Sequence, residues 1–229
     1  GHAIYNHAIK EMQWQGVNPW SFSKVSEAGR SRKDKRLFRS DMPAFMEALK
    51  SVSEDMRMLF LTSLFTSRRI GECKCMRWQD IDLEDGIWII PQYIGEERTG
   101  KFKEQSQTAV LPPQLVSMLQ DYQRIVSDSP WVFPSERSKT GHVVEYKNAW
   151  AIIRKCGFQH LNANDLRGTM GSWSQDVGMP LVGTSQQMGH SNIDTTANKY
   201  SRIALEVQRE GITAAVADML KSAEKNAKK

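Results

Sequence analysis

The most restrictive feature of this 229-residue sequence is a single change of hydrophobic period near its middle. On both sides, apolar residues recur at helical spacing, as in Met42, Phe45 and Leu49 at positions i, i+3 and i+7. Two β-type runs, GIWIIP over 86–91 and QTAVLP over 107–112, flank a polar stretch with two glycines, which predicts a hairpin with an enlarged loop. The sequence therefore predicts an α+β fold, mainly helical with one small antiparallel sheet.

The helical segments can be bounded from apolar spacing and from capping residues. Ser40 is a suitable N-cap for a helix that runs through Leu49, and glycines at 157, 178 and 189 separate later segments. The other expected helices cover residues 3–15, 54–65, 69–77, 113–126, 145–156, 164–177, 180–188, 191–201 and 204–223.

The composition excludes several classes of protein. Hydrophobic residues make up 40% and charged residues 25%, which is typical of a globular chain with a proper core. No apolar run approaches the roughly 20 residues that a membrane span requires, so we expect no membrane partner. Three cysteines, without CxxC spacing, indicate a reducing compartment and make a zinc site improbable. We expect no metal and no cofactor.

Positive charge is concentrated near the start of the chain. The formal net charge is +5, and residues 20–39 have the composition of a linker. Such a cluster is either a solvated loop or a segment that follows a phosphate backbone. We take its basic residues as candidate DNA contacts: Arg30, Arg32, Lys33, Lys35, Arg36 and Arg39.

Three short stretches have residue types suited to phosphate chemistry. The first is TSRRIGE over 66–72, followed by MRWQDID over 76–82; the second is NDLRGT over 164–169. The third is MGHSNIDTTANKY over 188–200, in which Gly189 ends one helix and a capping pattern starts the next. Taken singly, each has an ordinary structural explanation, such as an exposed i, i+3 ion pair between Arg69 and Glu72.

In this order and spacing, the three stretches resemble the boxes of the tyrosine recombinase (phage integrase) family. The first is similar to the family's TGLRxxE…LxWxDID box, the second to HxLRxT, and the third to LGHxxxxTTxxY. The resemblance covers about residues 36–205. It implies the catalytic-domain fold of that family, and an enzyme that cuts and rejoins DNA through a covalent 3′-phosphotyrosine.

The resemblance also implies a role for each matching residue. Arg69 and Arg167 would hold the scissile phosphate with forked, permanently charged donors, and His190 would hydrogen-bond it. Tyr200 would be the nucleophile, and Glu72 would support the cationic groups. The family's hairpin lysine, usually the general acid, corresponds best to Lys103, with Lys101 the second candidate and a further DNA contact.

The sequence departs from the family pattern at three positions. Asn164 stands where the family usually has His or Lys, and asparagine carries no proton at physiological pH. The phosphate would still be bound, but proton removal from Tyr200 would be slower. Ser67 replaces a preferred glycine, and Arg68 replaces a preferred apolar residue.

The family's architecture gives the expected organisation and partners. Residues 1–39 would be the end of an N-terminal core-binding helical domain plus the linker, 40–205 the catalytic domain, and 206–229 a helical tail that docks in cis or in trans. We expect a monomer in isolation, a homotetramer on double-stranded DNA, and a cytoplasmic, nucleoid-associated location in a bacterium or phage-infected cell. Integration or excision of a mobile element is the expected event. The alternatives are a DNA-binding module without catalysis and a type IB topoisomerase.

Overall fold

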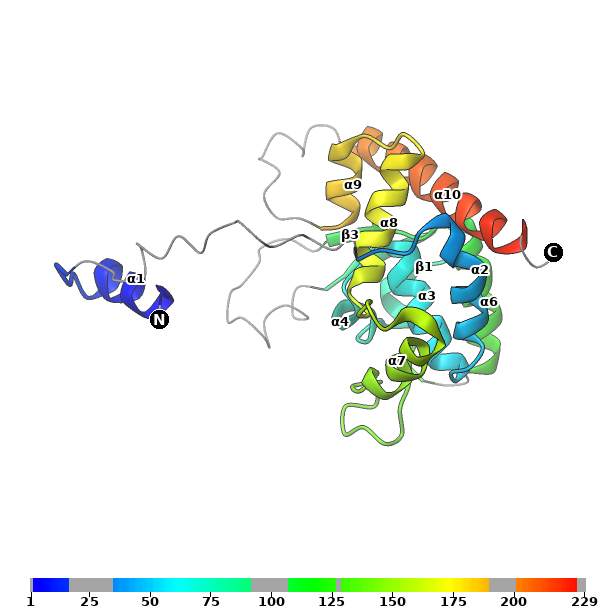
Figure 1. Ribbon diagram of the computed structural model, residues 1–229, viewed down its shortest axis with the longest axis horizontal. Coiled ribbons are helices and arrows are strands. Elements are labelled where there is room, and N and C mark those ends of the chain that lie inside the picture. Colours follow the sequence, from blue (N-terminus) through cyan, green and yellow to red (C-terminus); the bar gives the residue numbers. More distant parts are fainter. Residues whose placement is uncertain (1, 17–34, 92–106, 127–128, 190–200, 226–229) are drawn as a thin grey trace. The chain divides into compact units, whose positions relative to one another are not determined.

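The structure is a computed structural model that describes residues 2–16, 35–91, 107–126, 129–189 and 201–225 (Figure 1). The chain divides into two compact units, Gly1–Asp34 and Lys35–Lys229. In the first unit, helix α1 spans His2–Glu11, and the Tyr5 ring lies 5.6 Å from the ring of Trp14, centroid to centroid. The linker residues 35–39, which the sequence grouped with the N-terminal part, belong to the second unit.

The second unit is mainly helical, as the hydrophobic spacing predicted. Its described helices are η2 (Arg39–Asp41), α2 (Met42–Leu49), α3 (Glu54–Thr66), α4 (Ile70–Cys73), η3 (Trp78–Asp80), α6 (Pro113–Ile125), α7 (Lys147–Ile153), the π-helical turn η4 (Arg154–Phe158), α8 (Asp165–Asp176), α9 (Leu181–Gln187) and α10 (Ser201–Lys225). Except for its last residue, Ser201, the expected helix over 191–201 lies outside the described residues.

Helix α3 runs through the centre of this unit. Every residue from Met58 to Thr66 is buried, which is the pattern of a helix surrounded by protein. It packs against α8, α4 and α6. At its N-terminal end, the Tyr122 hydroxyl of α6 donates a 2.6 Å hydrogen bond to Asp55. The centrally placed α3 therefore carries the TSRR stretch directly onto the side of α8.

The β-structure is an antiparallel sheet with strand order β1-β2-β3. Strands β2 (Ile87–Ile90) and β3 (Gln107–Val110) pair as the sequence predicted, with Trp88 opposite Ala109 and Ile90 opposite Gln107. The prediction missed β1 (Ile81–Asp82), which pairs with β2. A strand of two residues is too short to show a period of two, so hydrophobic alternation gave no signal for it.

The helix expected over 69–77 is wrong in its C-terminal half. Helix α4 ends at Cys73, and the chain then turns to pair with a distant segment. The Val132 N–H donates to the Met76 carbonyl at 2.9 Å, and Arg77 forms a bridge with Trp131. Tertiary pairing thus replaces the helical hydrogen bonds that local propensity favoured.

Helix α10 packs against several other elements of the second unit. Figure 1 shows α10 (orange to red) crossing near α8 and α2, and it also packs against α9, α6 and β3. Ile212, Val216 and Met219 are fully buried in the core. No helix among the described residues, this one included, is both long and apolar enough to cross a membrane.

Candidate active site

The first candidate arginine lies at the start of α4. Arg69 is the N-cap residue, its Nη1 donates to Glu72 Oε1 at 3.1 Å, and its backbone N–H donates to Glu72 Oε2 at 3.2 Å. The Arg69 side chain is 52% exposed, whereas that of Glu72 is 17% exposed. This is the i, i+3 pair that the sequence allowed. The carboxylate restrains Arg69 and leaves part of its guanidinium open to an incoming anion.

The second candidate arginine comes from α8 and meets the first stretch. The neighbours Leu166 and Met170 are fully buried, which fixes the rotation of α8. Arg167 Nη1 donates to the Ser67 carbonyl at 3.2 Å, and the Ser67 hydroxyl donates to the Arg167 carbonyl at 3.0 Å. Two stretches that are 100 residues apart are therefore tied together two residues before Arg69.

The Arg167 side chain has an unusual electrostatic environment. Burial, followed by the nearby positive charge of Arg69, lowers the pKa of Arg167 to about 10. The Glu72 carboxylate acts in the opposite direction. A site that gathers positive charge and partly removes its water favours a bound anion, because the anion supplies the opposite charge that hydration no longer provides.

A third arginine joins this region, and sequence reasoning did not assign it a role. Arg68 is 1% exposed, and its guanidinium donates to the Gln107 Oε1 at 2.7 Å and to the Thr108 carbonyl at 2.6 Å. Burial lowers the pKa of Arg68 as well. The available signal was its departure from the family's apolar residue, together with the doubled arginine at a helix N-terminus.

Asn164 is exposed and lies at the N-cap of α8. Its backbone N–H donates to the Asn162 Oδ1 at 3.0 Å, and its carbonyl accepts from the Arg167 N–H at 3.2 Å. The amide side chain is therefore near the head of the helix that carries Arg167, where the family's proton-carrying residue would stand.

Several sequence-predicted residues lie outside the described part of the chain. These are His190, Tyr200, Lys101, Lys103, Arg30, Arg32 and Lys33. The described chain reaches Gly189, which follows α9 with a φ of +64°. Glycine adopts this left-handed conformation more easily than other residues do, so Gly189 has the backbone expected of a residue that ends a helix in a sharp turn. Among the described residues, no three His, Cys, Asp or Glu side chains gather as metal ligands would.

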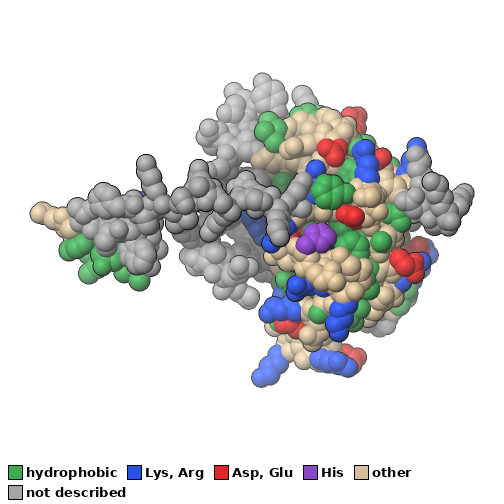
Figure 2. Space-filling view, in the orientation of Figure 1, with side chains coloured by type: hydrophobic (Ala, Val, Ile, Leu, Met, Phe, Trp, Pro, Cys, Tyr) green, Lys and Arg blue, Asp and Glu red, His purple; other side chains and the backbone are tan. Residues whose placement is uncertain are grey.

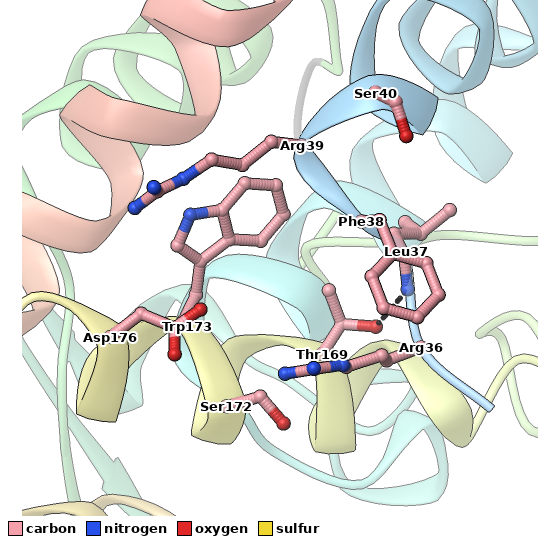
Figure 3. A pocket seen from close by; sticks show the side chains of 9 residues that line it. All are labelled: Arg36, Leu37, Phe38, Arg39, Ser40, Thr169, Ser172, Trp173 and Asp176. Atoms are coloured by element: carbon pink, nitrogen blue, oxygen red, sulfur yellow. Dashed lines mark hydrogen bonds between the residues drawn. The ribbon is translucent and has the colours of Figure 1, made fainter. Parts of the chain in front are cut away.

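The described linker residues lie on another side of α8. Figure 3 shows Arg36 to Ser40 around a cavity of about 340 Å³, completed by Thr169, Ser172, Trp173 and Asp176 of α8. The Leu37 N–H donates to the Thr169 hydroxyl at 3.0 Å. Thr169 is two positions after Arg167 in α8. Side chains two positions apart on an α-helix point in directions that differ by about 200°. This cavity is therefore separate from the arginine site.

Arg39 is held by the C-terminal helix. Its Nε donates to Asp218 Oδ2 at 2.9 Å, and the same oxygen accepts a 2.9 Å hydrogen bond from the Trp173 indole N–H. The Arg39 side chain remains 56% exposed. Of the expected DNA contacts, Arg39 thus has a carboxylate partner within the chain, while Lys35 is exposed.

A basic surface around α7 was missed by the sequence analysis. Figure 2 shows Lys and Arg side chains, in blue, at the lower end of the visible face, where Figure 1 places α7. The exposed cations of this segment are Arg137, Lys139, Lys147, Arg154 and Lys155. They are spread over 137–155 without forming a run, so no local cluster marked them.

A mainly helical domain with a small antiparallel sheet, in which two arginines from distant boxes meet, is the catalytic-domain fold of the tyrosine recombinases. The chain belongs to the phage integrase family, which it matches over residues 35–206.

Curated relatives agree with this membership. The chain is 23% identical to a tyrosine recombinase XerC-like protein of Caldanaerobacter subterraneus, over 87% of this chain and 59% of that protein. It is 24% identical to the prophage integrase IntF of Escherichia coli, over 87% of this chain and 43% of that protein. The chain thus spans about half the length of the curated relatives it matches.

Solved structures share the fold. The Tn1549 transposon integrase in complex with transposon right end DNA superposes with a TM-score of 0.62 at 15% identity, over 90% of this chain and 75% of that one. The integrase of mycobacterium phage Brujita gives a TM-score of 0.56 at 17% identity, over 93% of this chain and 68% of that one.

Proposed function

We propose that this chain is the catalytic part of a site-specific DNA recombinase, which cuts and rejoins DNA strands through a covalent 3′-phosphotyrosine. The observation that carries the proposal is the pair of hydrogen bonds between Ser67 and Arg167. These bonds tie the arginine of one family box to the stretch that carries the arginine of another. Family membership over residues 35–206 supports the same conclusion.

The two arginines suit the transition state of phosphoryl transfer. When an oxygen attacks a phosphodiester, negative charge grows on the nonbridging oxygens of a five-coordinate phosphorus. Arg69 has an exposed guanidinium restrained by Glu72, and Arg167 is held by the Ser67 carbonyl. Donors that are already in place stabilise growing charge without reorganising, and losing one such donor costs about 100-fold to 1,000-fold in rate.

The remaining steps follow from the resemblance. The Tyr200 oxygen attacks phosphorus after losing its proton, and the bond from phosphorus to the 5′-oxygen breaks. Lys103 donates a proton to that leaving oxygen, with Lys101 as the second candidate, and His190 hydrogen-bonds the phosphate. The 3′-phosphotyrosine keeps the energy of the broken bond, so a 5′-hydroxyl reverses the reaction without ATP. The chemistry needs neither metal nor cofactor.

The DNA partner is supported by the distribution of charge. We propose that the linker cations Arg30, Arg32, Lys33, Lys35 and Arg36 follow the phosphate backbone, and that the basic surface around α7 adds contacts. In this arrangement Arg39 mainly fixes the linker to Asp218. Four copies assembled on a recombination site in the cell's DNA would integrate or excise a mobile element.

The second candidate is a recombinase-like protein that occupies DNA without cutting it. Asn164 favours it, because an exposed amide at this position transfers no proton. Arg69, Arg167 and Tyr200 favour the enzyme, since a module that only binds DNA needs no nucleophilic tyrosine in addition to two phosphate-binding arginines.

A selection for covalent products tests the proposal without knowledge of the target sequence. The chain is incubated with a pool of nicked duplexes that carry a randomised window, and DNA that stays attached to protein in detergent is recovered and sequenced. The nick releases the short strand next to the cut and so traps the intermediate. We expect the pool to converge on one sequence. Arg69→Ala and Arg167→Ala should each reduce the adduct strongly, while Arg124→Ala, at an exposed pair with Asp121, should not.

Binding without an adduct would support the second candidate instead. If the recovered yield stayed at the level of a protein-free control while gel shifts still showed DNA binding, the recombinase proposal would be wrong. Relaxation of supercoiled plasmid by the isolated chain would indicate a topoisomerase-like activity.

A further inference from the structure

Arg68 is a buried cation without an obvious reason to be one. It stands where the family prefers an apolar residue, and it is 1% exposed. Within the described part of the chain it forms no salt bridge, and its Nε has no hydrogen-bond partner. Burying a charge without a carboxylate partner is costly, and an apolar side chain of similar volume often leaves such a site as stable or more stable. Stability alone therefore gives no account of this arginine.

The contacts of Arg68 join two further segments to the site. Its guanidinium donates to the Gln107 side chain and to the Thr108 carbonyl, both at the start of β3. Gln107 is the first described residue after the segment that carries Lys103, four positions earlier in the sequence. Arg68 therefore fixes the strand by which the chain returns from the candidate general acid.

The second segment is the corner that precedes His190. A Cβ atom built on Gly189 would overlap both the Arg68 guanidinium and the Gln107 amide oxygen. The backbone of Gly189 thus lies directly against the hydrogen bond between Arg68 and Gln107. Arg68 also directly precedes Arg69 in the sequence, so its backbone is joined to that of a proposed phosphate-binding residue.

We propose that Arg68 is a positioning residue: its buried guanidinium sets the start of β3 and the Gly189 corner relative to Arg69 and Arg167. This inference rests on the proposed recombinase function. Arg68 has its charge and two of its donors committed within the protein, so its effect on the reaction passes through other residues. The chain keeps an unfavourable buried charge because three segments of the active site are aligned by it.

The test uses the DNA sequence recovered by the selection and two forms of it. One form has the natural 5′-oxygen at the cleavage point, and the other has a bridging sulfur there. Sulfur leaves without a proton, so the second form does not need a general acid. Single-turnover cleavage at saturating DNA is measured for the wild type, Arg68→Met, Gln107→Met, the double variant and the control Arg124→Met.

Misalignment of a catalytic group by about 1 Å costs about 100-fold, so we expect Arg68→Met to slow cleavage of the oxygen substrate by roughly that factor. On the sulfur substrate the loss should be at least about tenfold smaller, because that substrate needs no proton donor; any loss that remains there is the part that passes through the Gly189 corner. Gln107→Met should act in the same direction, and the double variant should be no slower than Arg68→Met. The thermal midpoint of Arg68→Met should stay close to that of the wild type. Gln107→Met should be less stable, because it removes one of the two acceptors of the buried Arg68. Arg124→Met should cleave normally.

Three results would overturn the proposal. They are normal cleavage by Arg68→Met, an equal loss on both substrates, and additive losses in the double variant. If Arg68→Met does not fold, Gln107→Met carries the comparison of the two substrates by itself. Failure of the recombinase proposal looks different, because the wild-type chain would then cleave neither substrate.

Discussion

Ser67 and Arg167 hold each other through two hydrogen bonds of opposite direction, one from the Arg167 guanidinium and one from the Ser67 hydroxyl. Ser67 is the C-cap of α3 and has φ 57° and ψ 20°, a left-handed conformation that costs a non-glycine residue about 1 to 2 kcal/mol. The family's preference for glycine at this position follows from that backbone. Serine is more strained than glycine in this conformation, but its hydroxyl forms a hydrogen bond with α8 that glycine could not form.

The Ser67 relationship predicts an order of stability between two variants. Ser67→Ala keeps the left-handed backbone and loses the hydroxyl bond, whereas Ser67→Gly loses the same bond but relieves the strain. We expect Ser67→Gly to be more stable than Ser67→Ala by about 1 kcal/mol. Chemical denaturation of both variants measures the difference. Equal stabilities would show that the conformation at position 67 carries no strain.

Anion binding should depend on pH through Arg167. Burial and Arg69 lower the pKa of Arg167 to about 10, so the free site loses its charge as the pH rises through that value. A bound dianion favours the charged form. Sulfate, which does not titrate in this range, should bind with constant affinity from pH 7 to 9 and up to about tenfold more weakly per pH unit above 10.

Arg167→Gln is the control for this titration. This variant should bind sulfate more weakly than the wild type at neutral pH. Its sulfate affinity should also fall less steeply above pH 10, because residue 167 then carries no charge to lose. Identical pH profiles for the two proteins would contradict the assignment.

The exposed Asn164 should limit the rate of cleavage. Asn164→His restores a group that carries a proton, and we expect it to raise the single-turnover rate by about tenfold or more near neutral pH, with a rate that follows the titration of the new histidine. Gln120→His, at an exposed glutamine of α6, should have no effect. No gain, or a loss, at position 164 would rule out this explanation of the departure.

The linker cations should differ in their effect on DNA binding. Because Arg39 is engaged by Asp218, Arg39→Gln should leave the salt dependence of DNA affinity unchanged and reduce stability by up to about 1 kcal/mol. Lys35→Gln should lower the slope of log affinity against log salt by about one. Titration of DNA binding at several salt concentrations distinguishes them. Equal slopes for the two variants would place Arg39 on the DNA.

Hydrophobic spacing predicted the helices and the β2–β3 pair because these elements bury one face or a whole segment. It missed β1 and the early end of α4, since both depend on partners far away in the sequence, Trp88 for β1 and Val132 for the segment after α4. Family motifs singled out Arg69 and Arg167. No local pattern reports that Arg68 is buried, because burial of a cation depends on Gln107 and Gly189 arriving beside it.

The central claim is that a tyrosine on this chain becomes joined to a DNA 3′ end. The most direct test isolates the covalent product, digests protein and DNA, and identifies the modified peptide by mass spectrometry. We predict a nucleotide remnant on Tyr200, linked through a 3′-phosphate, and no adduct from Tyr200→Phe. A remnant on another residue, or an undiminished adduct from Tyr200→Phe, would contradict the account.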